Sequence, residues 1–254
     1  MAERKAVYRC PKCKTEIPFG TREKPPPSRC PNCHRRLYIP SDYDGPLAHI
    51  AEWVFQFALE REAQPFRRLK PNARIVVAGV GPERAAAATR QTIERFQPPA
   101  VISCGYAGAL CQDLAVGEVV YVAGVIDEQR QGSRCDAIRG TCLLLSVSQI
   151  VAEPSDKIRL GEEYSADLVD MESAAIARVC SEANVPFGCI RVVSDSVSQR
   201  LSPTIARLLG DGQISVWKTM PAILRNPLVI AELLRLARDT KIASLKLGEA
   251  LARL

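Results

Sequence analysis

After residue 50, short apolar runs alternate with longer stretches in which apolar residues recur at helical spacing. The short runs predict strands, and the periodic stretches predict helices. Strands are expected at Trp53–Leu59, Ala73–Gly79, Ala100–Cys104, Glu118–Ile126, Cys142–Val147 and Phe187–Ser194. Helices are expected at Glu83–Phe96, at Asp170–Ala183 and over most of the last 50 residues. This alternation of strands and helices is typical of an α/β fold.

The first 40 residues differ in composition from the rest of the chain. They hold 10 of the 34 basic residues and only three of the 28 acidic ones, so the net charge of +6 belongs to this segment. A linker, Ile39–Pro46, separates it from the near-neutral body. Excess positive charge favours an anionic partner, so contact with nucleic acid is a hypothesis for this segment alone.

Two near copies of one motif, Arg9-Cys-Pro-Lys-Cys-Lys14 and Arg29-Cys-Pro-Asn-Cys-His34, lie in this basic segment. Two such Cys-x-x-Cys pairs can offer four thiolates to one tetrahedral zinc ion, and iron in a rubredoxin-like site is the alternative. We therefore predict a small zinc ribbon with the ligands Cys10, Cys13, Cys30 and Cys33. A zinc ion with four protein ligands has no open position, so it would stabilise the module without taking part in catalysis.

The remaining composition, 47% hydrophobic and 24% charged, fits an ordinary globular protein. No apolar run approaches the roughly 20 residues that a membrane helix needs, and the charged N-terminus lacks the apolar region of a signal peptide. The other six of the 10 cysteines are scattered singly and are expected to be buried thiols in a reducing compartment. We therefore expect a cytoplasmic protein that has no contact with a membrane.

Candidate catalytic groups are few. The only two histidines are His34 and His49, in or near the N-terminal segment, which argues against histidine-dependent nucleophilic catalysis in the body. Three carboxylates follow predicted strands or begin a predicted helix, namely Glu62, Glu172 and Asp195. Because ligands of α/β sheets bind at strand ends, these carboxylates are the candidates for acid–base chemistry.

Four segments, in order, resemble motifs of the nucleoside phosphorylase/nucleosidase superfamily. They are Ala58–Glu62, the glycine-rich Gly79–Ala87, the block Val101–Val120 with Gly105-Tyr-Ala-Gly108, and the run Asp170–Asp195 with Asp170-Met-Glu172 and Ser194-Asp195. The resemblance covers roughly residues 50–200. By pattern the chain is similar to methylthioadenosine/S-adenosylhomocysteine nucleosidases, and around Ser146–Lys157 it is similar to hopanoid-associated phosphorylases.

This resemblance implies a three-layer α/β/α phosphorylase/hydrolase-like domain with a mixed central sheet, preceded by the zinc ribbon. The expected boundaries are 1–45 for the ribbon and linker, 46–225 for the nucleosidase-like domain and 226–254 for a helical extension. The extension is expected to pack on the body through Leu228, Ile230, Leu233, Leu234 and Leu236. The polar stretch Asp127–Arg139 is short, so a helix of the family is expected to be reduced or missing there.

The resemblance also implies a role for each carboxylate. Glu62 would take a proton from the water that attacks C1′ of a ribosyl group, and Glu172 would bind ribose hydroxyls. Asp195, held by Ser194, would protonate N7 of the purine and is therefore expected to be partly buried. Further substrate contacts would come from Gly81, Gly105, Tyr106 and Met171. No cofactor is implied for catalysis, and a homo-oligomer is expected.

The implied reaction is cleavage of an adenosine-type nucleoside by water, with two alternatives. Phosphorolysis would need phosphate as co-substrate, which Arg61 or Arg84 could bind, although Ser103 stands where phosphorylases of the superfamily have an arginine. Glu62 would repel phosphate, which favours hydrolysis. The other alternative is a non-catalytic nucleoside sensor that binds nucleic acid or protein through its ribbon. Tyr106 supports it, because this side chain replaces a small residue and would crowd the ribose pocket.

Overall fold

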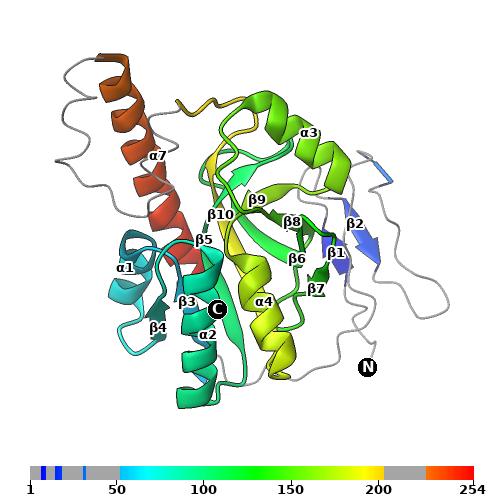
Figure 1. The fold of residues 1–254 in the computed structure, drawn as a ribbon, viewed down its shortest axis with the longest axis vertical. Helices are drawn as coiled ribbons and strands as arrows, with labels where there is room; N and C mark the ends of the chain where they lie inside the picture. Colours follow the sequence, from blue (N-terminus) through cyan, green and yellow to red (C-terminus); the bar gives the residue numbers. More distant parts are fainter. Residues whose placement is uncertain (1–6, 10–14, 19–30, 33–51, 203–226) are drawn as a thin grey trace.

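The apolar runs of the body form one mixed sheet of eight strands (Figure 1). The computed structural model describes residues 7–9, 15–18, 31–32, 52–202 and 227–254. The strands are β3 (Val54–Phe57), β4 (Arg74–Val77), β5 (Val101–Ala109), β6 (Val119–Asp127), β7 (Gly132–Arg134), β8 (Cys142–Ser146), β9 (Leu168–Asp170) and β10 (Phe187–Asp195). All six predicted strands are confirmed. The two additional strands, β7 and β9, have three residues each and are too short to give a clear periodic signal.

The sheet curls until two of its strands meet. Its order is β10-β6-β8-β9-β5-β3-β4, and β10 pairs in addition with β5. The strands β5, β6, β8, β9 and β10 therefore form a closed ring, from which β3 and β4 extend. β5 runs parallel to β3 and β10 but antiparallel to β9. The mixed sheet that the resemblance implied is confirmed. The closure of five of its strands into a ring was not predicted from the sequence.

Helices cover both sides of this sheet (Figure 1). They are α1 (Glu60–Leu69), α2 (Pro82–Phe96), α3 (Pro154–Tyr164), α4 (Ser173–Glu182) and α7 (Pro227–Ala252). On one side α2 and α4 contribute Ala85, Ile176 and Cys180 to a buried apolar cluster. On the other side α1 and α7 contribute Phe66 and Leu247 to a second cluster. These four helices each bury apolar residues against the sheet, which is the arrangement expected of an α/β protein.

The structure corrects the start of one helix. Residues 170–183 were expected to be helical, but Asp170 ends β9 and α4 begins at Ser173. The carboxylate of Asp170 accepts hydrogen bonds from the Ser173 backbone N–H at 3.1 Å and from the Ser173 hydroxyl at 2.6 Å. These bonds satisfy backbone and side-chain donors at the first turn of α4, where a helix has free N–H groups. Between Ile126 and Cys142 the described chain contains β7 and no helix, as expected.

The C-terminal helix α7 packs on the body mainly through residues that were not predicted from the sequence. Ala243, Leu247 and Leu251 are buried in the cluster beside α1. Leu236 is also buried, but Leu234 is 67% exposed, so the expectation that Leu234 packs on the body was wrong. The apolar face continues beyond Leu236 along the second half of the helix, where its contact with the sheet lies.

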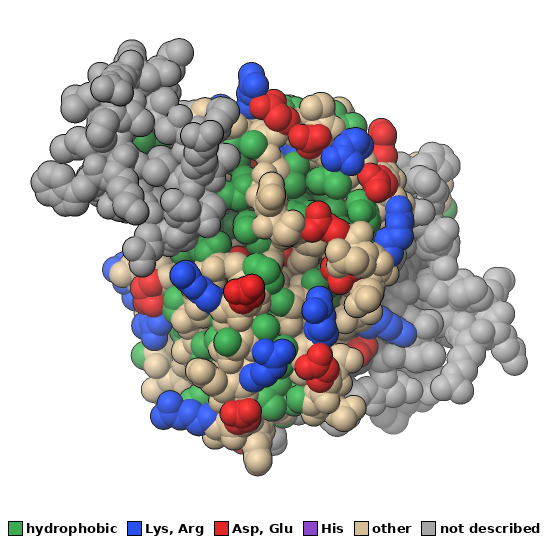
Figure 2. Space-filling model, viewed as in Figure 1, with side chains coloured by type: hydrophobic (Ala, Val, Ile, Leu, Met, Phe, Trp, Pro, Cys, Tyr) green, Lys and Arg blue, Asp and Glu red, His purple; other side chains and the backbone are tan. Residues whose placement is uncertain are grey.

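The surface of the body carries mixed charge. Basic and acidic side chains are interspersed over the face shown in Figure 2. In the described part of the chain, no helix combines the length and the low polarity that crossing a membrane would require. Five of the six body cysteines are buried, which agrees with their expected role as small apolar residues.

Candidate active site

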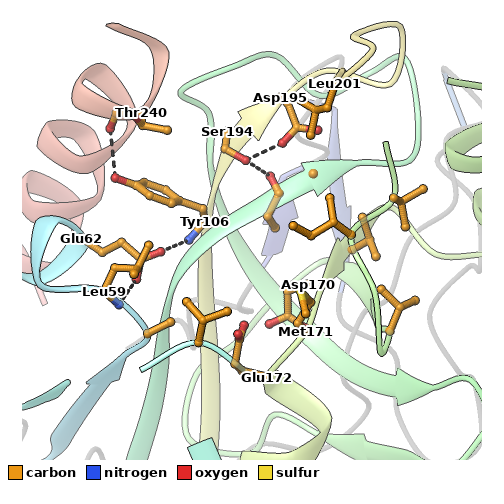
Figure 3. A pocket seen from close by; sticks show the side chains of 18 of the residues that line it. Leu59, Glu62, Tyr106, Asp170, Met171, Glu172, Ser194, Asp195, Leu201 and Thr240 are labelled. Atoms are coloured by element: carbon orange, nitrogen blue, oxygen red, sulfur yellow. Dashed lines mark hydrogen bonds between the residues drawn. The ribbon is translucent and has the colours of Figure 1, made fainter. Parts of the chain in front are cut away.

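A cavity of about 420 Å³ lies beside the ends of β3, β9 and β10 and next to the second half of β5 (Figure 3). This volume is in the range of sites that bind small molecules. Six of the eight predicted catalytic and substrate-binding residues line it: Glu62, Tyr106, Met171, Glu172, Ser194 and Asp195. Figure 3 shows that Glu62, Glu172 and Asp195 reach it from three different sides. Gly81 and Gly105 do not line this cavity, although both contact residues that do.

Glu62 is held rigidly in the first turn of α1. One carboxylate oxygen accepts a hydrogen bond from the Leu59 backbone N–H at 2.8 Å, and the other accepts one from the Tyr106 N–H at 3.0 Å. A side chain at Gly105 would place its Cβ 2.9 Å from the same carboxylate, so glycine is needed there for close approach. Burial raises the pKa of Glu62, and the two backbone N–H groups oppose this shift. A raised pKa suits a carboxylate that must take up a proton near neutral pH.

Glu172 is bound by the glycine-rich loop. The Gly81 backbone N–H donates to its carboxylate at 2.8 Å, and Gly81 has φ +107°, a conformation that favours glycine. The loop that could have bound an anionic ligand thus binds a carboxylate of the protein itself. Burial, with a further contribution from the charge of Asp170, raises the pKa of Glu172 to about 7.

The raised pKa of Glu172 makes stability depend on pH. A carboxyl group whose folded-state pKa exceeds its unfolded-state value stabilises the fold fully below the unfolded value of 4.5, and this contribution is lost as pH rises through about 7. We expect the free energy of unfolding to fall by up to about 3 kcal/mol over this window. Glu172→Gln should flatten this part of the profile, measured by denaturant unfolding between pH 4.5 and 8. Glu182→Gln, at an exposed position of the same helix, should leave the profile unchanged. An equally steep profile in Glu172→Gln would contradict the assignment.

A buried arginine lies behind the two glutamates. Arg191 donates to Asp170 at 2.8 Å and to the Ser103 hydroxyl at 2.6 Å, and both charged side chains are almost fully buried. A second cavity of about 20 Å³ is bounded by Gly105, Arg191 and both glutamates, Glu62 and Glu172. A space of this size can hold one water molecule, which needs about 10–15 Å³ of this kind of volume. The sequence reasoning missed Arg191, because a charged residue inside an apolar run gives no sign of its partner.

Asp195 ends β10 and is buried, as expected of a proton donor. One carboxylate oxygen lies 2.6 Å from the Ser194 hydroxyl. That hydroxyl also lies within 3.2 Å of the Ala107 carbonyl oxygen, so its single proton has two acceptors within reach. Ser194 can donate to the ionised Asp195, or donate to Ala107 and accept from the protonated acid. The other oxygen of Asp195 accepts from Lys157 at 2.5 Å, a contact that the sequence reasoning did not find.

Tyr106 connects the cavity to the C-terminal helix. Its hydroxyl donates to the Thr240 carbonyl oxygen at 3.2 Å and contacts the Ser244 hydroxyl. Leu236 and Thr240 of α7 line the cavity as well, and Leu59 lines it next to Glu62. Tyr106 therefore lines the cavity between Glu62 and α7. Candidate ligand-binding residues on α7 were not predicted, because helix periodicity alone does not show which site a helix approaches.

The four cysteines of the predicted zinc ribbon lie outside the described residues. Three short pieces near them are described, residues 7–9, 15–18 and 31–32. β1 (Val7–Arg9) pairs antiparallel with β2 (Glu16–Pro18), and the Asn32 side chain donates to the Thr15 hydroxyl at 3.2 Å. Among the described residues, no group of three or more histidine, cysteine or acidic side chains could hold a metal ion.

Comparison with known proteins supports the resemblance to nucleoside phosphorylases and nucleosidases independently of the site geometry. The sequence profile described as "Phosphorylase superfamily" matches residues 66–140 and 139–206, together more than half of the 254 residues. The chain is 28% identical over 181 residues to 5′-methylthioadenosine/S-adenosylhomocysteine nucleosidase of Staphylococcus haemolyticus, covering 58% of this chain and 79% of the relative. The same nucleosidase of Staphylococcus aureus is 26% identical over 181 residues, covering 59% of this chain and 79% of the relative.

Two solved structures show the same fold at lower identity. Arabidopsis thaliana 5′-methylthioadenosine nucleosidase has a TM-score of 0.58 at 16% identity, covering 79% of this chain and 93% of that one. Futalosine hydrolase of Helicobacter pylori has a TM-score of 0.56 at 16% identity, covering 80% of this chain and 97% of that one. The profile match decides the family: this chain belongs to the Phosphorylase superfamily.

Proposed function

We propose that the protein hydrolyses the N-glycosidic bond of an adenosine-type purine nucleoside. The observation that carries this proposal is the convergence of Glu62, Glu172 and Asp195 on one cavity of nucleoside size. The relatives from Staphylococcus are by name nucleosidases that act on 5′-methylthioadenosine and S-adenosylhomocysteine. At 26–28% identity they support a nucleosidase activity more strongly than a particular 5′ substituent.

Cleavage of an N-glycosidic bond needs a base for water, an acid for the leaving group and negative charge near the oxocarbenium-like transition state. Glu62, buried beside the small water-sized cavity, would take the proton from the attacking water. Glu172 would accept hydrogen bonds from ribose hydroxyls while the Gly81 N–H holds it in place. Asp195 would deliver a proton to N7, so that the purine leaves as a neutral base.

The charges around the cavity favour water over phosphate as the nucleophile. Five acidic residues line the main cavity: Glu60, Glu62, Asp170, Glu172 and Asp195. Arg61 is the single lysine or arginine among its described lining residues. Arg84 lines a separate hollow between β4 and α2. Arg191 and Asp170 neutralise each other, as do Lys157 and Asp195. The carboxylates of Glu62 and Glu172, held by backbone N–H groups, are therefore the charges that a phosphate would chiefly meet. A phosphate dianion in this setting would face net repulsion.

A panel of purine nucleosides tests this proposal. We expect release of free adenine from adenosine-type nucleosides in phosphate-free buffer, measured by chromatography of the bases. Variation of the 5′ group (hydroxyl, methylthio, homocysteinyl) will identify the substrate. Tight binding of these nucleosides without release of any base would contradict the proposal and favour a nucleoside sensor.

We further propose that the N-terminal segment binds one zinc ion through Cys10, Cys13, Cys30 and Cys33. The described contact between Asn32 and Thr15 supports it, since Asn32 stands between Cys30 and Cys33 in the sequence and Thr15 is two residues beyond Cys13. The β1–β2 pairing supports it also, because the first cysteine pair falls in the connection between these strands.

Metal analysis of the purified chain checks the zinc proposal. We expect about one zinc ion per chain, because four thiolates satisfy tetrahedral zinc. Cys30→Ser/Cys33→Ser should lose the metal, and Cys111→Ser in the body should keep it. Full zinc content in the double variant would show that the ion is bound elsewhere.

A further inference from the structure

We propose that Lys157, which lies outside the cavity, is a positioning residue for Asp195. This inference rests on the proposed function, since it assigns a residue that orients the acid of the same reaction. Lys157 belongs to the first turns of α3 and its side chain is fully buried. It is not among the residues that line the main cavity, so it would act through Asp195 and not on the substrate.

All three protons of the Lys157 ammonium group have acceptors. It donates to one carboxylate oxygen of Asp195 at 2.5 Å, to the Ser196 carbonyl oxygen at 2.9 Å and to the Gln199 carbonyl oxygen at 3.0 Å. A lysine has three donors and no acceptor, so its hydrogen bonding is complete. One side chain thus fixes both the carboxylate and the loop that follows β10.

The two oxygens of Asp195 are held by different partners. Ser194 contacts one oxygen and Lys157 the other, which fixes the rotation of the carboxylate plane. Ser194 adjoins Asp195 in the sequence, whereas Lys157 comes from another element, 38 residues away. Asp195 lines the cavity between these two restraints, so that it can meet a purine without first being reoriented.

The packing of α3 brings Lys157 within reach. Gly161 lies one turn after Lys157 on the same face of the helix. A Cβ at Gly161 would lie 2.6 Å from the Leu110 carbonyl oxygen, so α3 approaches the end of β5 as closely as a glycine allows. On the other side of the carboxylate, a Cβ at Gly108 would lie 3.1 Å from the Asp195 oxygen that Lys157 contacts. Both glycines leave room for the ion pair.

A stability role alone explains this ion pair poorly. Removing a lysine and a carboxylate from water is unfavourable, and apolar residues of similar size often stabilise a core equally well. The pair lies at the edge of the cavity, with the Asp195 side chain 12% exposed and Lys157 fully buried. An ion pair in this position is better suited to orient the Asp195 carboxylate than to stabilise the fold.

The test compares two substrates that differ in their need for an acid. A purine nucleoside needs protonation of its leaving group, whereas 4-nitrophenyl riboside releases a stable anion without it. We expect Lys157→Met to lower kcat for the purine nucleoside by about 100-fold, at the lower end of the range for general acid catalysis. Its KM, and its kcat for the aryl riboside, should change by no more than about threefold. An equal loss on both substrates, or no loss on either, would overturn the proposal.

A double-mutant cycle gives a second measurement. In the Asp195→Asn background, Lys157→Met should lower purine nucleoside cleavage by no more than about twofold, because coupled residues are not additive. This double variant also removes both buried charges together, which avoids an unpaired charge. If the loss of activity in the double variant equals the product of the losses in the two single variants, Lys157 acts independently of Asp195.

If the chain cleaves neither substrate, the proposed function is refuted. Ligand binding can then still test whether Lys157 positions Asp195. 9-Deazaadenosine carries a proton at N7 and can donate to Asp195, whereas 7-deazaadenosine has a C–H group at that position. We expect Lys157→Met to weaken binding of the 9-deaza compound by about tenfold, the worth of one charge-assisted hydrogen bond, with little effect on the 7-deaza compound. Equal effects on both ligands, or none, would contradict the positioning role.

Discussion

Glu62→Gln is expected to lower kcat for purine nucleoside hydrolysis by about 1000-fold, within the range for loss of a general base. Glutamine keeps the size of the side chain but cannot take up the proton of water. KM should change little, because the substrate hydroxyls are assigned to Glu172. Initial rates of base release with saturating nucleoside measure this effect.

Stability must be measured beside activity for this variant. Both oxygens of Glu62 accept backbone N–H groups, and glutamine can satisfy only one of them. The unpaired N–H group costs about 1–3 kcal/mol, partly offset by removal of a buried charge. Glu94→Gln is the matched control, since Glu94 is exposed on α2 and does not line the cavity. Undiminished hydrolysis by a folded Glu62→Gln protein would remove Glu62 from the mechanism.

Asp195→Asn is expected to lower purine nucleoside hydrolysis by about 100- to 10 000-fold, the contribution of a general acid. Asparagine can still donate a hydrogen bond to N7 but cannot transfer a proton. An aryl riboside whose leaving group needs no proton should lose less than about tenfold, because the rest of the site is intact. The rates of the variant and of the original protein on both substrates, measured under the same conditions, give the two losses to be compared.

The aryl riboside also serves as the folding control for Asp195→Asn. The substitution leaves the Lys157 ammonium group without its charged partner, which lowers stability. Asp136→Asn, with an exposed carboxylate near the surface residue Arg134, is the matched control and should keep both activities. Equal losses on the two substrates would show that Asp195 supports the structure without acting as the acid.

Much of the fold could be predicted from local patterns. Each of the six apolar runs read as strands is a strand, because runs bounded by polar and turn residues signal buried strands well. The helix α1 was missed, since Glu60–Leu69 carries many charged residues and a proline at position 65. Closure of the strand ring could not be predicted, because pairing of β10 with both β5 and β6 depends on the curl of the whole sheet.

The residues of the site also fall into those that could be predicted from the sequence and those that could not. Glu62, Glu172 and Asp195 were found because short motifs contain them, and the structure brings all three to one cavity. Lys157 and Arg191 were not found, because their importance comes from partners distant in the sequence. The glycines Gly81 and Gly105 were expected at the substrate, and in the structure they contact the carboxylates of Glu172 and Glu62. Sequence motifs thus contained the candidate acid–base groups, whereas the residues that hold these groups could be found only in the folded chain.

The sugar product formed in phosphate buffer tests the central claim most directly. We expect NMR of the reaction of an adenosine-type nucleoside to show free ribose, or its 5′-substituted form, with no phosphate ester at C1. The reason is that an incoming phosphate would meet the carboxylates of Glu62 and Glu172, with Arg61 as the single lysine or arginine among the described lining residues. Accumulation of ribose 1-phosphate, or of its 5′-substituted form, would contradict hydrolysis and show that the site accepts phosphate.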